Sequence, residues 1–214
     1  SYDQLIHDAA LQKLPMVLAV DRAGFARADG PTHHGLFDVS MALSLPESRI
    51  FAPLDFKSLD LFLESALKEQ AITFIRYRSG GPSKCAAELP YIYKEEFLRG
   101  KVPHGPLDGV ILTYGQQCDE ALKAQSLAEA QGKKIAVLAL ESLRPTKTLT
   151  AALLSLIGSC QNVLFAEEGV KNGGAGENFA AAFAPYFAKS GTVLKICAVR
   201  DPFLQESARE DLLT

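Results

Sequence analysis

A polar segment over residues 21–38 holds the chain's densest group of side chains that can do chemistry. It contains two arginines, three aspartates and two histidines, separated by glycines and a proline that let the backbone turn tightly. Arg22 can bind an anion through two parallel hydrogen bonds, and Asp29 can accept hydrogen bonds from substrate hydroxyls. His33 or His34 can move a proton or donate to an oxyanion near neutral pH. The segment therefore predicts a site for a polar, phosphorylated small molecule.

The same residues also fit a surface loop with capping aspartates and exposed histidines. For a lone arginine or histidine that structural interpretation is favoured. The whole cluster, however, directly follows the apolar run 16–20, and open α/β sheets bind ligands beyond the carboxyl ends of their strands. Its position therefore favours a functional site. Adjacent His33 and His34 project in different directions from an extended chain, which disfavours a two-histidine metal clamp.

Alternating strand and helix patterns surround this segment and predict an α/β fold. The almost wholly apolar run 16–20 is typical of a strand buried on both faces of a parallel sheet. Further strands are expected over 49–52, 72–75, 109–114, 134–140, 162–166 and 193–198. Helices are expected over 57–69, 118–131, 148–157 and 175–187. The alternation in the second half favours a parallel or mixed sheet with helices on both faces.

Capping residues predict where these four helices begin and end. Asp55 is the expected N-cap of the first, and Gly132 stops the second. Thr148 or Lys147 is expected near the cap of the third. Pro185 is expected to bend or end the last helix.

Composition changes after residue 78. The run 79–83 reads Ser-Gly-Gly-Pro-Ser, which breaks regular structure, and the residues up to 106 show no sustained period. We therefore place a connection over 81–106, between a first unit of residues 1–80 and a second of residues 107–214.

The overall composition is that of a soluble globular protein. Of 214 residues, 48% are hydrophobic and 22% are charged, which excludes a disordered, collagen-like or coiled-coil chain. The 22 basic and 25 acidic residues give a net charge of −3, so we expect neither a nucleic-acid nor a membrane partner. No apolar run approaches the roughly 20 residues of a membrane helix, and the first residues lack a signal-peptide pattern.

The four cysteines are Cys85, Cys118, Cys160 and Cys197, and their spacing matches no zinc or redox motif. Cys160 and Cys197 lie in or beside apolar runs, where a reduced cysteine behaves as a small hydrophobe. We expect four structural thiols, no metal site, and a reducing, cytoplasmic compartment.

A glycine-rich cluster over 173–176 precedes the last expected helix. It can be an anion site at a helix N-terminus, or a loop that needs positive φ angles and close packing. The structural interpretation is favoured because the full dinucleotide-binding fingerprint is missing. Glu167 and Glu168 are expected to cap a loop or line an interface, not to form an acid–base dyad.

Several motifs resemble one enzyme family. Residues 21–38, DRAGFARADGPTHHGLFD, closely resemble the 1-deoxy-D-xylulose-5-phosphate synthases, which are thiamine-diphosphate enzymes of the transketolase superfamily. The shorter DGPTH core is shared with transketolase. The resemblance continues through YDQLIHDAALQKLPMVLAVDRAG, APLDF, FIRYRSGG and EEGVKNGGAGENF, and so covers most of the chain.

The resemblance implies a reaction and roles for matching residues. The family condenses pyruvate with D-glyceraldehyde 3-phosphate and releases carbon dioxide, in isoprenoid-precursor and thiamine biosynthesis. Arg22 is implied to hold the acceptor phosphate, and Asp29 and His33 to hydrogen-bond the acceptor and assist proton transfer. A second phosphate-binding arginine is implied at Arg78, with Arg76 as the alternative, because RYRSGG lacks the family's intervening proline.

The resemblance also implies an incomplete transketolase-like pyrimidine-binding domain over 1–80. A transketolase C-terminal-like α/β domain with a mainly parallel sheet is implied over 107–214. Thiamine diphosphate and Mg²⁺ are implied for the full-length enzyme, with binding residues mostly upstream of this chain and none assigned within it. We therefore expect the C-terminal fragment of a homodimeric synthase, inactive without the missing N-terminal domain.

Three departures from the family pattern leave other functions open. Arg27 replaces a glycine, the RYRSGG proline is missing, and no arginine follows the Phe37–Asp38 pair closely. These changes fit a divergent paralogue with a different acceptor. The alternatives are a transketolase or another thiamine-diphosphate component, and a non-catalytic assembly domain that kept the fold.

Overall fold

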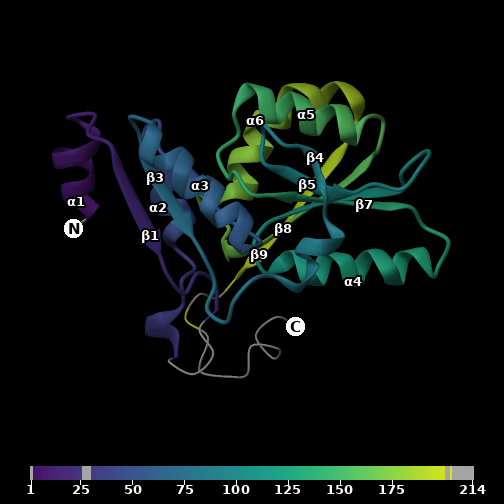
Figure 1. The fold of residues 1–214 in the computed structure, drawn as a ribbon. Helices are drawn as coiled ribbons and strands as arrows, with labels where there is room; N and C mark the ends of the chain where they lie inside the picture. Colours follow the sequence, from purple (N-terminus) through teal and green to yellow (C-terminus); the bar gives the residue numbers. More distant parts are fainter. Residues whose placement is uncertain (1, 26–29, 201–202, 204–214) are drawn as a thin grey trace.

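The structure is a computed structural model that describes residues 2–25, 30–200 and 203. It places two α/β units side by side, each built on its own sheet (Figure 1). The α/β class and the mainly parallel pairing expected from the sequence are confirmed. Within the described part of the chain, no helix is both long enough and apolar enough to cross a membrane.

The first unit contains a three-stranded parallel sheet with the order β1-β3-β2. Its strands are β1 (Met16–Val20), β2 (Arg49–Phe51) and β3 (Ile72–Arg76). All five residues of the central strand β3 are buried. The helix α3 (Phe56–Lys68) connects β2 to β3, and the expected cap at Asp55 is confirmed, since its carboxylate accepts from the third residue of the helix.

The expected burial of β1 on both faces is wrong. None of its five residues is buried, and Met16 is 38% exposed. The physical reason is its position: β1 is an edge strand, and only β3 pairs with it in the described residues. Its apolar sequence is typical of an interior strand, but it lies at the edge of the sheet.

The family resemblance of residues 2–24 implies a helix before β1, and helical structure is found there, whereas the short helix after the polar segment was not expected. The chain begins with α1 (Tyr2–Gln4) and a π-helical stretch over Leu5–Ala10. The helix α2 (Asp38–Ser44) follows the polar segment and packs toward β2 and β8. Its seven residues are too few to show a clear helical period.

The second unit contains a six-stranded mixed sheet with the order β4-β5-β7-β6-β8-β9. The strands are β4 (Tyr91–Tyr93), β5 (Leu98–Lys101), β6 (Gly109–Thr113), β7 (Ile135–Leu140), β8 (Asn162–Val170) and β9 (Val193–Val199). The last four strands in that order are parallel, and β4 and β5 join antiparallel at one edge. Both antiparallel strands lie within 81–106, so the stretch expected as a connection contributes to this sheet.

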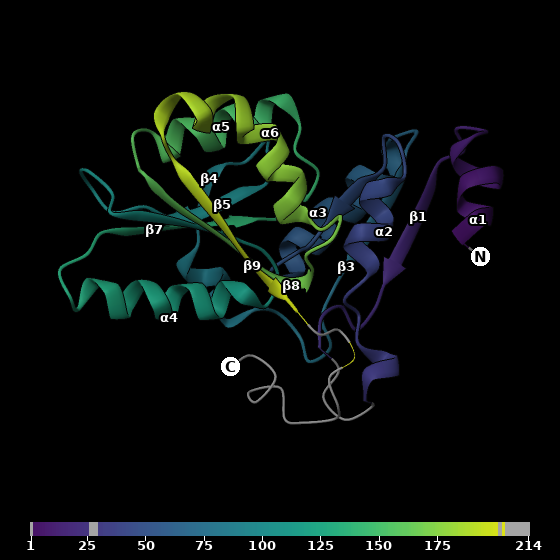
Figure 2. The same ribbon diagram turned by 180° about the vertical axis from the view of Figure 1, so that it is seen from behind.

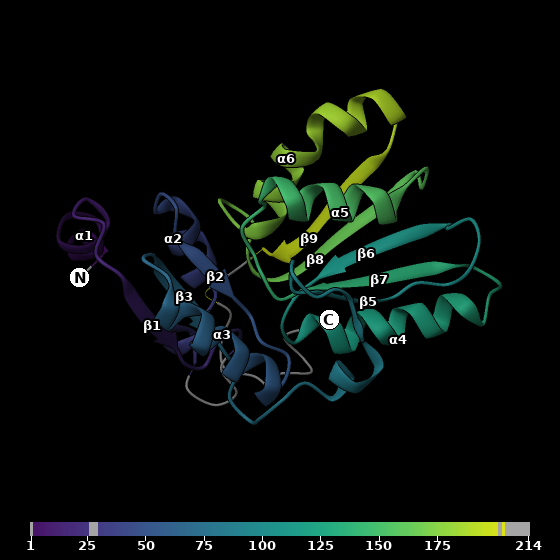
Figure 3. The same cartoon turned by 45° about the horizontal axis from the view of Figure 1, so that its top comes forward.

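Helices cover both faces of the second sheet, as expected. The helix α4 (Gln117–Glu129) lies on one face, and α5 (Lys147–Ile157) and α6 (Ala175–Ser190) lie on the other (Figures 2 and 3). The N-cap of α5 is Thr146, one residue before the expected position. Pro185 does not end α6, which continues to Ser190.

The two units share a core and a hydrogen-bonded junction. One cluster of buried apolar side chains extends from α2 and β2 into the second sheet and α6. After β7, the guanidinium of Arg144 reaches back to the carboxyl end of α2. It donates to the carbonyls of Ser48 (2.6 Å), Leu45 (2.8 Å) and Leu43 (3.1 Å). Helix-end carbonyls need such donors when they are withdrawn from water.

Candidate functional site

The predicted site segment leaves β1 and is held against the end of β3. Tyr77 N donates to Val20 O (3.0 Å), and Ala23 N donates to Tyr77 O (3.0 Å). Gly24 and Gly35 exchange two backbone hydrogen bonds of 2.9 and 2.8 Å, so the segment closes on itself beside the strand end. Because β1 and β3 are parallel, their carboxyl ends meet here, at the edge where such sheets bind ligands.

Arg22 and His33 are both exposed at this edge. Arg22 lies in a left-handed turn (φ 57°), with its N–H donating to Asp21 Oδ1 (2.7 Å). His33 ends the short 3₁₀-helix η2 (Pro31–His33), and its Nδ1 lies 3.0 Å from Thr32 Oγ1. Both side chains are therefore accessible to a ligand.

The two adjacent histidines have different surroundings. His34 is buried with its ring edge-to-face on Phe25, the ring centroids 5.2 Å apart, whereas His33 is exposed. Only His33 can meet a ligand from solvent. Asp29, the other predicted catalytic residue, lies outside the described residues, as does Arg27.

The two candidate phosphate-binding arginines also differ. Arg76 ends β3 with its side chain 2% exposed, and its Nε donates to Asp38 Oδ2 (2.7 Å). Its guanidinium lies over the ring of Tyr114, 5.2 Å from the centroid. Burial opposes its charge, but Asp38, Tyr114 and the nearby Glu168 raise the pKa of Arg76 above its ordinary value. Arg76 therefore links β3 to α2 through Asp38 and to the second unit through Tyr114.

Arg78 is more open, with its side chain 20% exposed. Its closest acidic partner is Asp119 on α4, with Nη1 3.6 Å from Oδ2. Nη1 has no hydrogen-bond partner within the described part of the chain. Nη2 of Arg76 likewise has no hydrogen-bond partner among the described residues, so each arginine keeps an unused donor. Arg78 differs in being the more exposed of the two, which makes its donor easier for a ligand to reach.

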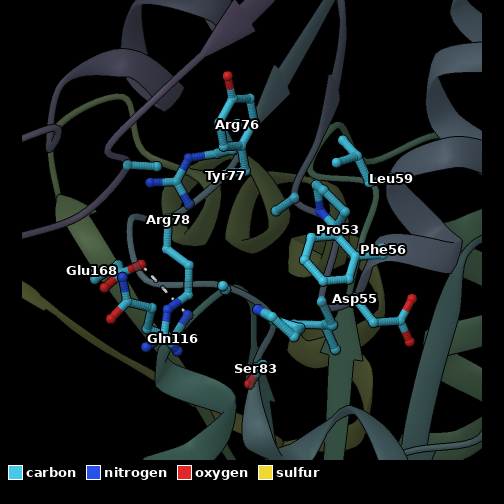
Figure 4. Close-up of a pocket in the computed structure, with 16 residues that line it drawn as sticks. Pro53, Asp55, Phe56, Leu59, Arg76, Tyr77, Arg78, Ser83, Gln116 and Glu168 are labelled. Atoms are coloured by element: carbon cyan, nitrogen blue, oxygen red, sulfur yellow. Dashed lines mark hydrogen bonds between the residues drawn. The ribbon is translucent and has the colours of Figure 1, made fainter.

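Both arginines line a pocket of about 80 Å³ between the two units (Figure 4). Apolar side chains form one wall, among them Pro53, Phe56 and Leu59, and polar groups form the other. The second unit contributes Gln116 and Glu168, which the sequence did not assign to the site. The available signal was the polar cluster 115–117 directly after β6, at a carboxyl strand end.

Gln116 is the least expected member of this pocket. It is 4% exposed, and its Oε1 has no hydrogen-bond partner among the residues that the structure describes. Its backbone N–H donates weakly to Glu168 Oε1 (3.5 Å), as drawn in Figure 4. Buried polar atoms are normally satisfied, so an orphaned amide oxygen marks a place where a ligand or water donates.

Gly24 allows Glu168 to approach the site segment. Gly24 has φ 90°, and a Cβ there would lie 2.7 Å from the Glu168 carboxylate. Only glycine adopts this positive φ without strain and also leaves room for the carboxylate. The backbone after β1 and a carboxylate near the end of β8 are thus packed directly together.

Glu167 points the other way, into the second unit. Its carboxylate accepts from Tyr114 Oη, Ala175 N and Gly176 N, each at 3.1 Å. Burial, opposed by these hydrogen bonds, raises the pKa of Glu167 to about 7. The N-terminus of α6 is therefore filled by an internal carboxylate, which confirms the structural interpretation of the glycine cluster and of this glutamate.

Sequence models of two domain families match the chain. Residues 1–80 match the transketolase pyrimidine-binding domain, and residues 101–213 match the transketolase C-terminal domain. The chain belongs to the transketolase family. The three-stranded sheet lies within the first match, and strands β6 to β9 of the six-stranded sheet lie within the second. We therefore call the two units the pyrimidine-binding domain and the C-terminal domain below.

Curated relatives narrow the relationship to 1-deoxy-D-xylulose-5-phosphate synthases, which are thiamine-diphosphate-dependent transferases. The enzyme of Carboxydothermus hydrogenoformans is 34% identical over 216 residues, covering 100% of this chain and 33% of the relative. That of Oleidesulfovibrio alaskensis is 30% identical over 214 residues, again covering 33% of the relative. The chain spans about a third of the length of these relatives, and it matches their C-terminal part.

Solved structures agree with the fold. A chain of a split-gene transketolase, crystallised as an inactive β4 tetramer, has a TM-score of 0.79 and 25% identity, covering 99% of this chain and 65% of that one. The transketolase of Campylobacter jejuni has a TM-score of 0.71 at 16% identity, with 96% of this chain and 30% of that one covered, which supports the fold alone.

Mg²⁺ accompanies the family's cofactor, and the described side chains offer this ion no site. Mg²⁺ prefers oxygen ligands, and the described residues contain no group of three or more His, Cys, Asp or Glu side chains that could hold a metal ion. The donors at the candidate site are the exposed Arg22 and His33 and the partly exposed Arg78. Such a set suits an oxyanion and a polar acceptor, so we derive no step through the cofactor.

Proposed function

We propose that this chain forms the acceptor-binding side of an active site for the 1-deoxy-D-xylulose-5-phosphate synthase reaction. In that reaction pyruvate loses carbon dioxide, and its two-carbon remainder is joined to D-glyceraldehyde 3-phosphate. The observation that carries the proposal is the position of Arg22 and Arg78 just after β1 and β3, two paired parallel strands, with the exposed His33 on the same segment as Arg22. Homology to the synthases supports it.

The residues have separate roles in this proposal. Arg22 and Arg78 bind the acceptor phosphate, since guanidinium groups match phosphate oxygens in geometry and charge. His33 donates to the aldehyde oxygen of the acceptor and moves a proton there as the new carbon–carbon bond forms. Asp29 accepts from the acceptor hydroxyl. Arg76 supports the site through its ion pair with Asp38.

In this proposal, the cofactor-binding part of the active site lies outside residues 1–214. Thiamine diphosphate and Mg²⁺ are bound by the region that corresponds to the other two thirds of the relatives, in a cytoplasmic homodimer that serves isoprenoid-precursor and thiamine biosynthesis. This chain alone is inactive, because half a cleft neither excludes water nor positions the reacting groups. Calorimetric titration of the chain with thiamine diphosphate and Mg²⁺ should show no binding, and tight binding would contradict this division.

The roles are tested by kinetics of the full-length protein. Arg22→Ala should raise the acceptor KM by about 10-fold or more, the loss expected for a charge-assisted hydrogen bond, with a smaller change in kcat. His33→Ala should lower kcat by about 100-fold, as for a lost general acid. Lys123→Ala removes an exposed charge on α4 and serves as the control, in which KM and kcat should stay unchanged. An unchanged acceptor KM in Arg22→Ala, or a parental kcat in His33→Ala, removes that residue from the mechanism.

Transketolase is the second candidate function, favoured by the split-gene transketolase among the similar structures. A donor screen separates the two. Turnover with pyruvate and not with ketose phosphates supports the synthase, and the reverse supports transketolase. Absence of turnover with either donor, in a full-length protein that binds thiamine diphosphate, would favour the non-catalytic assembly domain.

A further inference from the structure

Cys85 and Cys118 lie against each other in the C-terminal part of the chain, although they are far apart in sequence. Cys85 belongs to the short 3₁₀-helix η3 (Lys84–Glu88), and Cys118 to the first turn of α4. Cys85 is 2% exposed and Cys118 is 0% exposed. Both belong to one buried cluster, and Cys85 N donates to the carboxylate of Asp119, the neighbour of Cys118 (3.0 Å). The fold therefore brings two thiols from separate segments together.

Asp119, next to Cys118, fixes η3 against α4. Its Oδ1 accepts from Cys85 N (3.0 Å) and from Ser83 Oγ (2.9 Å). The Ser83 hydroxyl also lies 3.0 Å from Cys85 Sγ. One carboxylate on α4 thus holds the backbone of Cys85 and the side chain of Ser83, which keeps the start of η3 beside Cys118.

The surroundings of the pair are apolar. Cys85 and Cys118 belong to one buried cluster with Leu54, Leu89 and Leu122, among others. Burial and the neighbouring Cys85 raise the pKa of the Cys118 thiol well above its ordinary value. Both thiols are shielded from solvent in the closed structure, so oxidation needs a brief opening of η3.

The other two cysteines provide a contrast. Cys160 is buried, and its thiol donates to Asn162 O (3.5 Å), whereas Cys197 on β9 is exposed. Cys85 and Cys118 are free cysteines that are both buried and belong to the same cluster. A disulfide at that place would replace two buried S–H groups with a less polar bond.

We propose that Cys85 and Cys118 form a site of reversible two-electron oxidation, at which hydrogen peroxide links them in a disulfide. On opening, the Cys85 thiolate attacks peroxide oxygen, the O–O bond breaks, and a sulfenic acid and water result after protonation. The Cys118 sulfur then attacks the Cys85 sulfur, the S–O bond breaks, and a second water leaves. Two thiols and one peroxide give one disulfide and two waters, and a dithiol reductant reverses the change.

The cross-link would act on the wall of the interdomain pocket. Forming an S–S bond of about 2.05 Å draws η3 closer to α4. Ser83 lines the pocket, and Asp119 is the acidic partner of Arg78. Oxidation therefore fixes the segment that carries these groups, without touching Arg22 or His33.

Peptide mapping of the whole chain tests the proposal without any activity assay. The reduced chain is treated with hydrogen peroxide under native conditions, blocked with a thiol reagent in denaturant, and digested with trypsin without reduction. The expected product joins peptides 85–94 and 102–123, each of which contains one cysteine, and disappears with dithiothreitol. The oxidised chain should melt about 5 °C higher, because a loop of this length is closed.

Two variants and one condition complete the test. Cys197→Ser should give the same linked peptide, whereas Cys118→Ala should lose both the peptide and the rise in melting temperature. Peroxide treatment in urea should give a mixture of the six possible pairs, which shows that the native fold selects this one. The proposal is overturned if the native chain yields no linked 85–94 and 102–123 peptides while Cys197 oxidises fully, or if another pair predominates.

Discussion

The two edges of the first sheet differ in how they are completed. At the β2 edge, residues 141–143 of the C-terminal domain continue the pairing: Leu143 N donates to Ile50 O and Ala52 N donates to Glu141 O, each at 2.9 Å. The carboxylate of Glu141 adds a bond to Leu54 N (2.9 Å). At the β1 edge, no further strand pairs within the described residues.

Backbone geometry shows what the β1 edge offers. Met16 N and Val20 O bond toward β3 and its flanks, so the alternation of a strand points the backbone groups of Val17 and Ala19 outward. An apolar strand with free donors and acceptors is suited to pair with another strand. The site segment follows this open side, so its position is set by contacts to β3 and to the C-terminal domain. The closed edge should therefore carry most of the stability of the first domain.

Truncating one large side chain at each edge gives the largest expected contrast. Phe51 on β2 is buried and stacked on Phe62, with centroids 4.4 Å apart. Phe51→Ala should lower the free energy of unfolding by about 4 kcal/mol. Leu18→Ala on the half-buried β1 should cost about 1 kcal/mol. Urea unfolding of both variants measures the difference, and equal losses would show that the open edge is as well packed as the closed one.

Removing the interdomain arginine should have the next largest effect. Arg144→Ala withdraws the donors from three carbonyls near the end of α2 and should cost about 3 kcal/mol. Arg144→Lys, the matched control, keeps the charge but cannot serve several carbonyls at once, so it should recover only part of the loss. Chemical denaturation monitored by circular dichroism gives both values. A full recovery in the lysine variant would mean that charge, not hydrogen-bond geometry, holds the junction.

Local sequence patterns predicted most elements but not their neighbours. The strands 16–20, 72–75 and 109–114 and the Asp55 cap were recognisable because period, apolarity and capping chemistry lie within a few residues. Whether β1 has one neighbour or two depends on distant residues, so its burial was wrongly predicted. The short β4 and β5 strands were missed because β4 pairs with β5 and β5 pairs with the distant β7, and such pairing leaves no local signal in the sequence.

The site shows the same division. The place of Arg22 beside a strand end was predictable, because a polar cluster directly after an apolar strand has a defined place in an α/β sheet. The roles of Arg22 and His33 stay predictions. Gln116 was not, since its part in the pocket depends on how the two domains dock. The choice between Arg76 and Arg78 likewise needed the Asp38 contact, which is made across 38 residues of sequence.

The buried carboxylate of Glu167 makes the stability of the C-terminal domain depend on pH. Burial raises the pKa of Glu167 to about 7 from an ordinary value of 4.5. Between these values the folded protein keeps a proton that the unfolded chain releases, so the free energy of unfolding falls as pH rises. The contribution is complete below pH 4.5 and is lost as pH passes through 7.

Glu167→Gln, a neutral mimic, should remove that dependence. From pH 5 to pH 8 the wild type should lose about 2 kcal/mol more stability than the variant. Glu95→Gln, at an exposed position, should keep the wild-type slope. Urea unfolding at the two pH values measures this, and a Glu167→Gln slope equal to that of the wild type would mean that the carboxylate is ionised in the fold.

The smallest expected effect compares two glycines in the site segment. Both have positive φ, 90° at Gly24 and 72° at Gly30, so alanine is strained at either. A Cβ on Gly24 would also lie 2.7 Å from the Glu168 carboxylate, whereas nothing lies within 4 Å of one on Gly30. Gly24→Ala should therefore cost about 2 kcal/mol and Gly30→Ala about 1 kcal/mol. If thermal unfolding shows equal costs, Glu168 moves aside easily, and the C-terminal domain does not hold the site segment in place.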